Sequence, residues 1–203
     1  ATATTASYTT ILDAATPGEG EKPARSTTSA YRDVLDQLWL LDPLPAWIPQ
    51  DNQFQRLASS PKHFLADPAL AATLLELGPA DLLTTQLGLP AVPRPQPVLG
   101  ALFEHLVALS VLVYAEACDA RVSHFRALDG GREVDLIVER GRSVVAIEVK
   151  LAGQTSDRDI AHLRWLRDRL GDRLAAGIVV TTGTTGYRRE DGFLVIPAAL
   201  LGP

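Results

Sequence analysis

The sequence predicts an α/β domain with a mixed central sheet flanked by helices, preceded by a small helical segment. Residues 133–139 and 144–150 are typical of adjacent strands, because apolar and polar side chains alternate in the first and β-branched residues dominate the second. Residues 100–117 are apolar over the length of a helix, and residues 156–182 combine an amphipathic helix with an apolar strand. Helices interleaved with strands in this way usually cover both faces of one sheet.

The first 50 residues are predicted to form two helices, at residues 7–15 and 26–41. Ser26 is placed to cap the second helix, because a serine hydroxyl can accept a hydrogen bond from a free N–H in the first turn. Its expected apolar face consists of Tyr31, Val34, Leu35 and Leu38. Two helices joined by a loop fit either a winged-helix-like element or a small helical packing unit. Both interpretations stay open, since only Arg25 and Arg32 could reach phosphate.

A connecting region follows, in which an extended stretch at residues 61–68 turns into a short helix at 69–77. The proline-rich run 90–97 is a linker by composition. Residues 100–117 are apolar nearly all round the predicted helix, and we therefore expect this helix to be buried. Residues 121–127 are predicted to be the first strand of the sheet.

The next two strands are joined by Gly141-Arg142, which suits a two-residue type II′ turn because glycine occupies its first position. This turn sets Asp135 directly opposite Glu148, and Glu133 opposite Lys150. Two carboxylates that face each other repel unless a positive charge lies between them. A divalent cation with oxygen ligands would satisfy both, with Lys150 beside it. The alternative is a ladder of salt bridges on an exposed face, and the residues alone favour neither.

After the hairpin, Ser156 is expected to cap a helix that ends at Gly171. The apolar stripe of this helix consists of Ile160, Leu163, Leu166 and Leu170. A buried strand at 176–182 and a final short strand at 193–197 complete the predicted order. From residue 100 the order is therefore helix, three strands, helix and strand, followed by the final short strand.

Glu104 is a polar residue within the apolar helix at 100–117. A buried carboxylate is costly unless a cation or hydrogen bonds compensate it. One explanation is a first-turn glutamate stabilised by the helix N-terminus. The other is a third carboxylate that reaches the site of Asp135 and Glu148, which explains better why the residue is tolerated.

Composition limits the classes of function. The net charge of −5 argues against a protein that binds nucleic acid by bulk electrostatics. A single cysteine, Cys118, fits a reducing compartment, and the apolar run 106–115 is too short to span a bilayer. We therefore expect a cytoplasmic protein with no membrane segment. The chain contains no methionine, so we expect it to be a fragment of a larger polypeptide.

Other charged residues are assigned no chemistry. Arginines and aspartates interleave over residues 158–173, which predicts a solvated helix face. The histidines His63, His105, His124 and His162 show no common ligand spacing.

The order Glu104, Asp135 and Glu148-Val-Lys150, on a helix and two strands, resembles the PD-(D/E)xK nuclease superfamily. A closer resemblance, over essentially the whole chain, is to a domain of unknown function found C-terminal to the AAA-type ATPase core of many prokaryotic proteins. The motifs that carry it are Phe103-Glu104, Gly131-Arg-Glu-Val-Asp135, Ala146-Ile-Glu-Val-Lys150, Pro61-Lys62 with Asp67, the helix with Tyr31, and Leu44-Pro-Ala-Trp47.

The resemblance implies an αβββαβ nuclease-like core at residues 98–203, after a helical, winged-helix-like linking segment (1–50) and a connecting segment (51–97). It implies that Asp135, Glu148 and Glu104 bind Mg²⁺ or Mn²⁺ and that Lys150 is catalytic. The implied function is hydrolysis of DNA phosphodiesters by a domain attached to an upstream ATPase of the same polypeptide. The alternative is a non-catalytic module of this fold that binds nucleic acid or a protein partner and regulates the ATPase.

Overall fold

A six-stranded mixed sheet forms the centre of the protein in this computed structural model, which describes residues 3–5, 8–15, 24–48, 60–83, 95–127 and 131–202. The strands are β1 (Arg121–Arg126), β2 (Glu133–Arg140), β3 (Ser143–Lys150), β4 (Leu174–Thr181), β5 (Tyr187–Arg188) and β6 (Leu194–Pro197). The helices are α1 (Tyr8–Ala15), α2 (Arg25–Gln37), α4 (Pro68–Leu74), α5 (Pro79–Leu83), α6 (Pro95–Ala117) and α7 (Ala161–Leu170), with short 3₁₀ turns η1 (Gly171–Arg173) and η2 (Ala198–Leu200).

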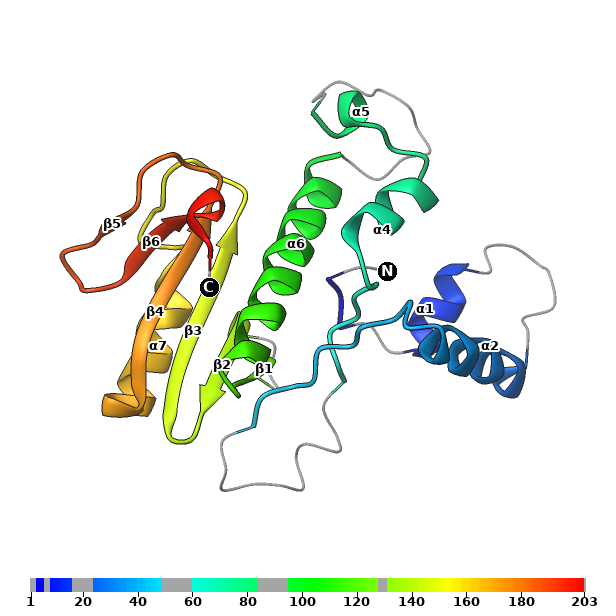
Figure 1. The fold of residues 1–203 in the computed structure, drawn as a ribbon, viewed down its shortest axis with the longest axis horizontal. Helices are drawn as coiled ribbons and strands as arrows, with labels where there is room; N and C mark the ends of the chain where they lie inside the picture. The colour runs from blue at the N-terminus through cyan, green and yellow to red at the C-terminus, as the bar shows by residue number, and fades with distance from the viewer. Residues whose placement is uncertain are drawn as a thin grey trace.

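The strand order in the sheet is β1-β2-β3-β4-β6-β5. The first three strands are antiparallel neighbours, β4 lies parallel to β3 and to β6, and β5 is antiparallel to β6. Helix α6 lies on one side of the sheet and α7 on the other (Figure 1). The predicted α/β class, with a mixed sheet flanked by helices, is therefore confirmed.

The hairpin of β2 and β3 has the predicted register. Leu136 pairs with Ile147, and Arg140 pairs with Ser143 across the turn. Gly141 has a φ of 59°, the left-handed value that a turn of this kind requires at its first position. The pairing of β2 with β3 ends at Leu136, one residue before Asp135, whose carboxylate accepts a hydrogen bond from the backbone N–H of Val149.

A β-bulge interrupts the alternation of side chains that the sequence predicts for β2. Ser123 pairs with Ile137 but Phe125 pairs with Val134, so β2 has an extra residue in this interval. Val134 therefore packs with Ile137 on the α7 side, whereas Leu136 packs on the α6 side. The strict alternation predicted for β2 is broken here, and Asp135 lies inside the bulge. Bulges next to functional sites commonly re-aim a side chain in this way.

Two cores lie on the two faces of the sheet. On the α6 side, Val107 and Val111 pack against Leu136 and other strand residues. On the α7 side, Ile160, Leu163 and Leu166 are buried against Ile137, Val144 and Val179. The predicted stripe of α7 is thus buried, apart from its last member, Leu170, which is partly buried at the edge of this core.

Two extended segments, residues 40–47 and 60–66, form what we call the strap. Backbone hydrogen bonds join Leu44 and Lys62 in both directions, with N to O distances of 2.8 and 2.9 Å. The strap also reaches β1, because Trp47 N donates to His124 O and His124 N donates to Pro45 O. Leu44 and Trp47 are buried in the two cores, one on each face of the sheet. The strap is therefore part of the packed structure, while the three-part division of the chain stays a prediction.

The predicted helix at residues 26–41 differs from α2 at both ends. The helix begins at Arg25 and ends at Gln37, so Ser26 lies inside it and no side chain caps it. Its expected apolar face is solvent-exposed, and Leu38 is 60% exposed. Among described residues before 49 there are two helices and isolated bridges but no strand, so the winged-helix interpretation stays a prediction.

Helices α6 and α7 also correct the predicted boundaries. Helix α6 begins at Pro95, so residues 95–97 of the expected linker are helical, and the part of that linker before 95 lies outside the described residues. It is not buried all round, because Val113 is 60% exposed. Helix α7 begins at Ala161, so Ser156 does not cap it. In the turn before α7, the backbone N–H and the hydroxyl of Ser156 both donate hydrogen bonds to Asp159 Oδ2, at 2.7 and 2.8 Å.

By length and composition alone, the segment of α6 from residue 98 to 117 could cross a membrane. In this structure the same helix supplies Val107, Ala108, Val111 and Ala115 to the core. A core helix of a globular domain passes the same test of length and composition.

Candidate functional site

Seven ionisable side chains from five parts of the fold meet at the end of the β2–β3 hairpin away from its turn. They are Lys62 of the strap, Glu104 of α6, Glu133 and Asp135 of β2, Glu148 and Lys150 of β3, and His162 of α7. We call them the charged cluster. All four residues singled out from the sequence, Glu104, Asp135, Glu148 and Lys150, lie in it.

Lys62 is the most enclosed cation of the charged cluster, with only 2% of its surface exposed. Its ammonium forms an ion pair with Glu104 and lies 3.4 Å from both Glu133 Oε1 and Asp135 Oδ1. Burial alone would lower the pKa of Lys62, but the negative charges of Asp135 and Glu104 raise it above its usual value. Lys62 is therefore charged at neutral pH.

Asp135 links the two halves of the charged cluster. Its Oδ1 contacts Lys62, while its Oδ2 accepts a hydrogen bond of 2.8 Å from the backbone N–H of Val149. The bulge in β2 and this cross-strand bond together fix where the carboxylate points. Asp135 thus lies between the group around Lys62 and the residues of β3.

Glu148 is buried, and its two oxygens have different surroundings. Oε2 accepts a hydrogen bond of 2.7 Å from the Lys150 ammonium. Oε1 is buried without a hydrogen-bond partner. His162 Nδ1 lies 3.7 Å from it, too far for a hydrogen bond, and donates instead to the backbone oxygen of Glu133 at 2.6 Å.

The charged cluster carries an excess of acid groups, with four carboxyl groups against the two lysine ammonium groups. Burial, and then the charge of Asp135, raise the pKa of Glu148 to about 8. The same two causes raise the pKa of Glu104 to about 7. Both carboxyl groups therefore keep a proton up to a higher pH than an exposed glutamate does. An additional cation would release those protons.

No set of three or more His, Cys, Asp or Glu side chains is arranged to hold a metal ion within the described ranges. A divalent ion at this site would therefore take only part of its ligands from the protein. The carboxylates of Asp135 and Glu148 fit such an ion in donor type and in charge, and the unpartnered Oε1 is a ready ligand atom.

Two models of known protein families match the sequence. A family model described as "Domain of unknown function (DUF4143)" matches residues 99–201, just over half of the 203 residues. The chain belongs to the DUF4143 family. A second model, "Domain of unknown function (DUF8612)", matches residues 1–81. Six members of the charged cluster lie in the DUF4143 region, and Lys62 comes from the region that the second model matches.

One solved structure resembles this DUF4143 protein at low similarity. It is the crystal structure of protein VC1899 from Vibrio cholerae, with 17% sequence identity and a TM-score of 0.38. The match covers 85% of this chain and 46% of that one, so the chain spans less than half the length of that protein. No curated protein matches the sequence.

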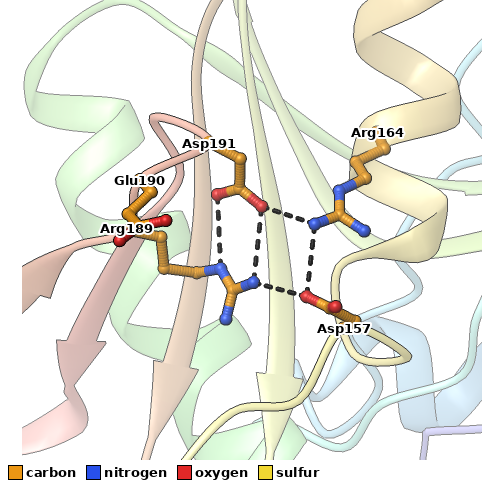
Figure 2. A pocket seen from close by; sticks show the side chains of 5 residues that line it. All are labelled: Asp157, Arg164, Arg189, Glu190 and Asp191. Carbon is orange, nitrogen blue, oxygen red and sulfur yellow. Dashed lines mark hydrogen bonds and ion pairs between the residues drawn. The ribbon is translucent and has the colours of Figure 1, made fainter.

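A second group of charges in the DUF4143 domain joins two loops beside α7 (Figure 2). Arg164 and Arg189 each contact both Asp157 and Asp191, so the four side chains form a closed ring. Glu190 also lines this hollow. The arginines are matched by carboxylates, and the ring ties the turn before α7 to the loop between β5 and β6. Arg164, which the sequence predicts to lie on a solvated helix face, therefore also links α7 to these two loops.

Three members of the charged cluster, Lys62, Glu133 and His162, were not assigned a role in the site from the sequence. Lys62 is separated from Glu133 by 71 residues, so no periodic pattern connects them. The only signal was the resemblance of Pro61-Lys62 to a family motif. His162 is the second residue of α7 and gives no sequence signal of its own.

Proposed function

We propose that this domain is a PD-(D/E)xK nuclease-like phosphodiesterase that uses Mg²⁺ or Mn²⁺ and acts on DNA. The element order α6-β1-β2-β3-α7-β4 supports the αβββαβ core. The positions of Asp135 on β2 and of Glu148 and Lys150 on β3 support the site. We further propose that the domain belongs to a cytoplasmic protein with an AAA-type ATPase upstream.

The observation that carries the proposal is the buried, unpartnered Oε1 of Glu148 beside an acid-rich cluster. A buried carboxylate oxygen without a partner costs free energy, and a bound cation would recover it. The raised pKa values of Glu148 and Glu104 share their causes, burial first and then the negative charge of Asp135, in a cluster where four carboxyl groups meet only two ammonium groups. A divalent ion matches that imbalance in sign and size.

The reaction needs a positioned water and stabilisation of the charge that develops on the phosphate. A bound divalent cation would lower the pKa of water and neutralise charge on the scissile phosphate. Asp135 and Glu148 would hold it, with water and phosphate oxygens as further ligands. Lys150 has a side chain that is 31% exposed and tethered to Glu148, so it can reach both water and substrate. Its role is to orient the attacking water and to donate a hydrogen bond to the phosphate.

A nuclease assay tests this proposal. Wild-type protein should cleave DNA with Mg²⁺ or Mn²⁺ and lose cleavage in EDTA. Lys150→Ala should reduce the rate by roughly 100-fold or more, as removal of one stabilising donor commonly does. Arg142→Ala changes an exposed cation in the hairpin turn and serves as the matched control. Equal cleavage by wild type and Lys150→Ala would contradict the assignment.

A second candidate is a non-catalytic module that binds nucleic acid or a protein partner and regulates the ATPase. The placement of Lys62 favours it, because one ammonium already neutralises part of the acid group. The net charge of −5 also makes the chain an unpromising general DNA binder. Absence of cleavage together with DNA or partner binding that survives Lys150→Ala would support this alternative.

A further inference from the structure

Two arginines beside α7 bind the same carboxylate oxygen. Arg164 lies on α7 and Arg189 on the loop after β5, and both donate to Asp157 Oδ1, at 3.2 and 2.6 Å (Figure 2). Guanidinium groups that converge on one anionic oxygen are a common means by which proteins bind phosphate. Asp157 therefore occupies the position at which an oxygen of a phosphate group would be bound.

The two aspartates of the ring are held differently. Asp191 has a side chain that is 19% exposed, and it accepts hydrogen bonds from Arg164 at 2.7 Å and from Arg189 at 3.2 Å. The side chain of Asp157 is 74% exposed, and exposed ion pairs contribute little free energy. Asp191 thus fixes the two guanidinium groups, whereas Asp157 can move away from them at small cost.

The two arginines keep donors for a larger anion. Nε and Nη1 of Arg164 and Nη1 of Arg189 have no hydrogen-bond partner among the residues that the structure describes. The hollow has a volume of about 380 Å³, within the range of about 300–1,000 Å³ that ligand sites usually span. Glu190 also lines it, but in the described part of the chain it pairs with neither arginine (Figure 2). The hollow therefore has room and free donors for a phosphate group.

The hollow lies at the same edge of the sheet as the charged cluster. Strand β3 ends at Lys150 and its parallel neighbour β4 ends at Thr181, so the loops that follow them leave the sheet at one edge. A hydrogen bond of 3.1 Å from Thr182 N to Ala152 O joins these loops. Ligands of α/β proteins commonly bind at the carboxyl ends of parallel strands.

Asp159 lies near both groups of charges. Burial raises the pKa of this carboxyl, but hydrogen bonds from Ser156 and then the charges of Lys150 and Arg189 lower it below its usual value. A charge has this effect on a carboxyl only when it is nearby. Lys150 and Arg189 are therefore neighbours of the same carboxyl group, and one strand of nucleic acid can reach both.

We propose that Arg164 and Arg189 form a phosphate-binding subsite for the backbone of a nucleic-acid strand, and that Asp157 fills the subsite until a phosphate replaces it. The choice of nucleic acid as the ligand rests on the proposed function, because the bound phosphate would belong to the strand that is cut beside Lys150. The exchange replaces one anionic acceptor with another, so both arginines stay paired. Contacts of this kind position a strand without reading its sequence.

DNA binding in EDTA tests the subsite without any contribution from a bound cation. The probe is a short fluorescein-labelled single-stranded DNA, and its anisotropy is followed as the full chain is added. Asp157→Asn removes the competing carboxylate, so it should bind the DNA roughly threefold or more tightly than wild type. Asp168→Asn is the matched control, because it removes an equal charge from an exposed position on α7, and it should change the affinity far less.

A second substitution shows whether the gain depends on the arginines. Arg164→Gln in the Asp157→Asn background should abolish the gain. Arg164→Lys keeps the charge but loses the planar pair of donors, so it should remove most of the gain. Circular dichroism identifies folded variants, and Arg189→Lys takes the place of an Arg164 variant that is unfolded. A gain of equal size in Asp168→Asn, or one that survives these arginine substitutions, overturns the inference.

The outcomes separate the subsite from the proposed function. If Asp157→Asn gains DNA affinity through Arg164 but no protein cleaves DNA with Mg²⁺, the subsite stands and the phosphodiesterase fails. If wild type cleaves DNA and Asp157→Asn shows no gain, the phosphodiesterase stands and the subsite fails. If Asp157→Asn gains affinity for inorganic phosphate but not for the DNA, the ligand is a free phosphate and the assignment to a strand is overturned.

Discussion

The carboxylate of Asp135 accepts a hydrogen bond from the backbone N–H of Val149, with 2.8 Å between Oδ2 and N. This bond joins the bulged part of β2 to β3 immediately after Glu148. It explains how an acid in an irregular part of a strand keeps a defined direction. The same residue then influences Glu104, Glu148 and Lys62 electrostatically.

The metal-free protein should lose stability as the pH rises from 6.5 to 8.5. Glu148 has a pKa of about 8 in the folded protein, above its unfolded value of 4.5, so the folded state binds more protons between these values and stability falls as the pH rises. One pKa unit corresponds to about 1.4 kcal/mol, so the loss over this window is about 2 kcal/mol, or roughly 4–8 °C in Tm. Burial lowers the pKa values of His105 and His124, so these histidines change charge at a pH below this window.

Thermal unfolding in EDTA across this pH range measures the effect. Glu148→Gln removes one of two titrating carboxyl groups and should reduce the slope, and the remaining slope comes from Glu104, whose pKa of about 7 lies in the same window. Saturating Mg²⁺ should flatten the wild-type profile as well, since a bound cation favours the ionised carboxylate. An identical slope in wild type and Glu148→Gln would show that Glu148 does not carry the pH dependence.

Gly177 of β4 should not tolerate a side chain. A Cβ at this position would lie 2.5 Å from the ring of Phe193, which is only 2% exposed and cannot move aside easily. Gly177→Ala should therefore lower the free energy of unfolding by about 1–3 kcal/mol, the usual cost of overpacking a core. Gly153→Ala is the control, because nothing lies within 4 Å of its Cβ position. Urea denaturation of both variants checks this, and equal stabilities would be the contrary result.

Much of the fold is readable from the sequence because it depends on local pattern. The glycine in the turn and the alternation of the flanking strands set the register that pairs Leu136 with Ile147. The apolar stripe of α7 likewise marks the face that packs on the sheet. Glu104 stood out because it is a carboxylate among apolar neighbours. These signals lie within a few residues of each other.

The rest depends on contacts between distant segments. Lys62 enters the site only because the strap packs against α6 and β1, and no local pattern shows this. The bulge at Asp135 results from the pairing of β1 with β2, which a single strand does not reveal. Helix α2 begins without a side-chain cap, so the serine that suggested its start was misleading. The metal, the substrate and the ATPase partner stay predictions.

The arginine–aspartate ring should depend more on Asp191 than on Asp157 (Figure 2). Both aspartates accept hydrogen bonds from both arginines, but the side chain of Asp191 is 19% exposed whereas that of Asp157 is 74% exposed. Asp191→Ala should lower the free energy of unfolding by about 1 kcal/mol or more. Asp157→Ala should change it by less than about 0.5 kcal/mol, as exposed ion pairs usually do. Differential scanning calorimetry distinguishes the two, and a larger loss in Asp157→Ala would refute the ranking.

The proposed phosphodiesterase activity requires that Asp135 and Glu148 bind a divalent cation. The most direct measurement is calorimetric titration of wild type, Asp135→Asn, Glu148→Gln and the exposed control Glu190→Gln with Mn²⁺. We expect saturable binding in wild type and in Glu190→Gln, and at least tenfold weaker binding in both cluster variants. Binding of equal strength in all four proteins, or no binding in wild type, would contradict it.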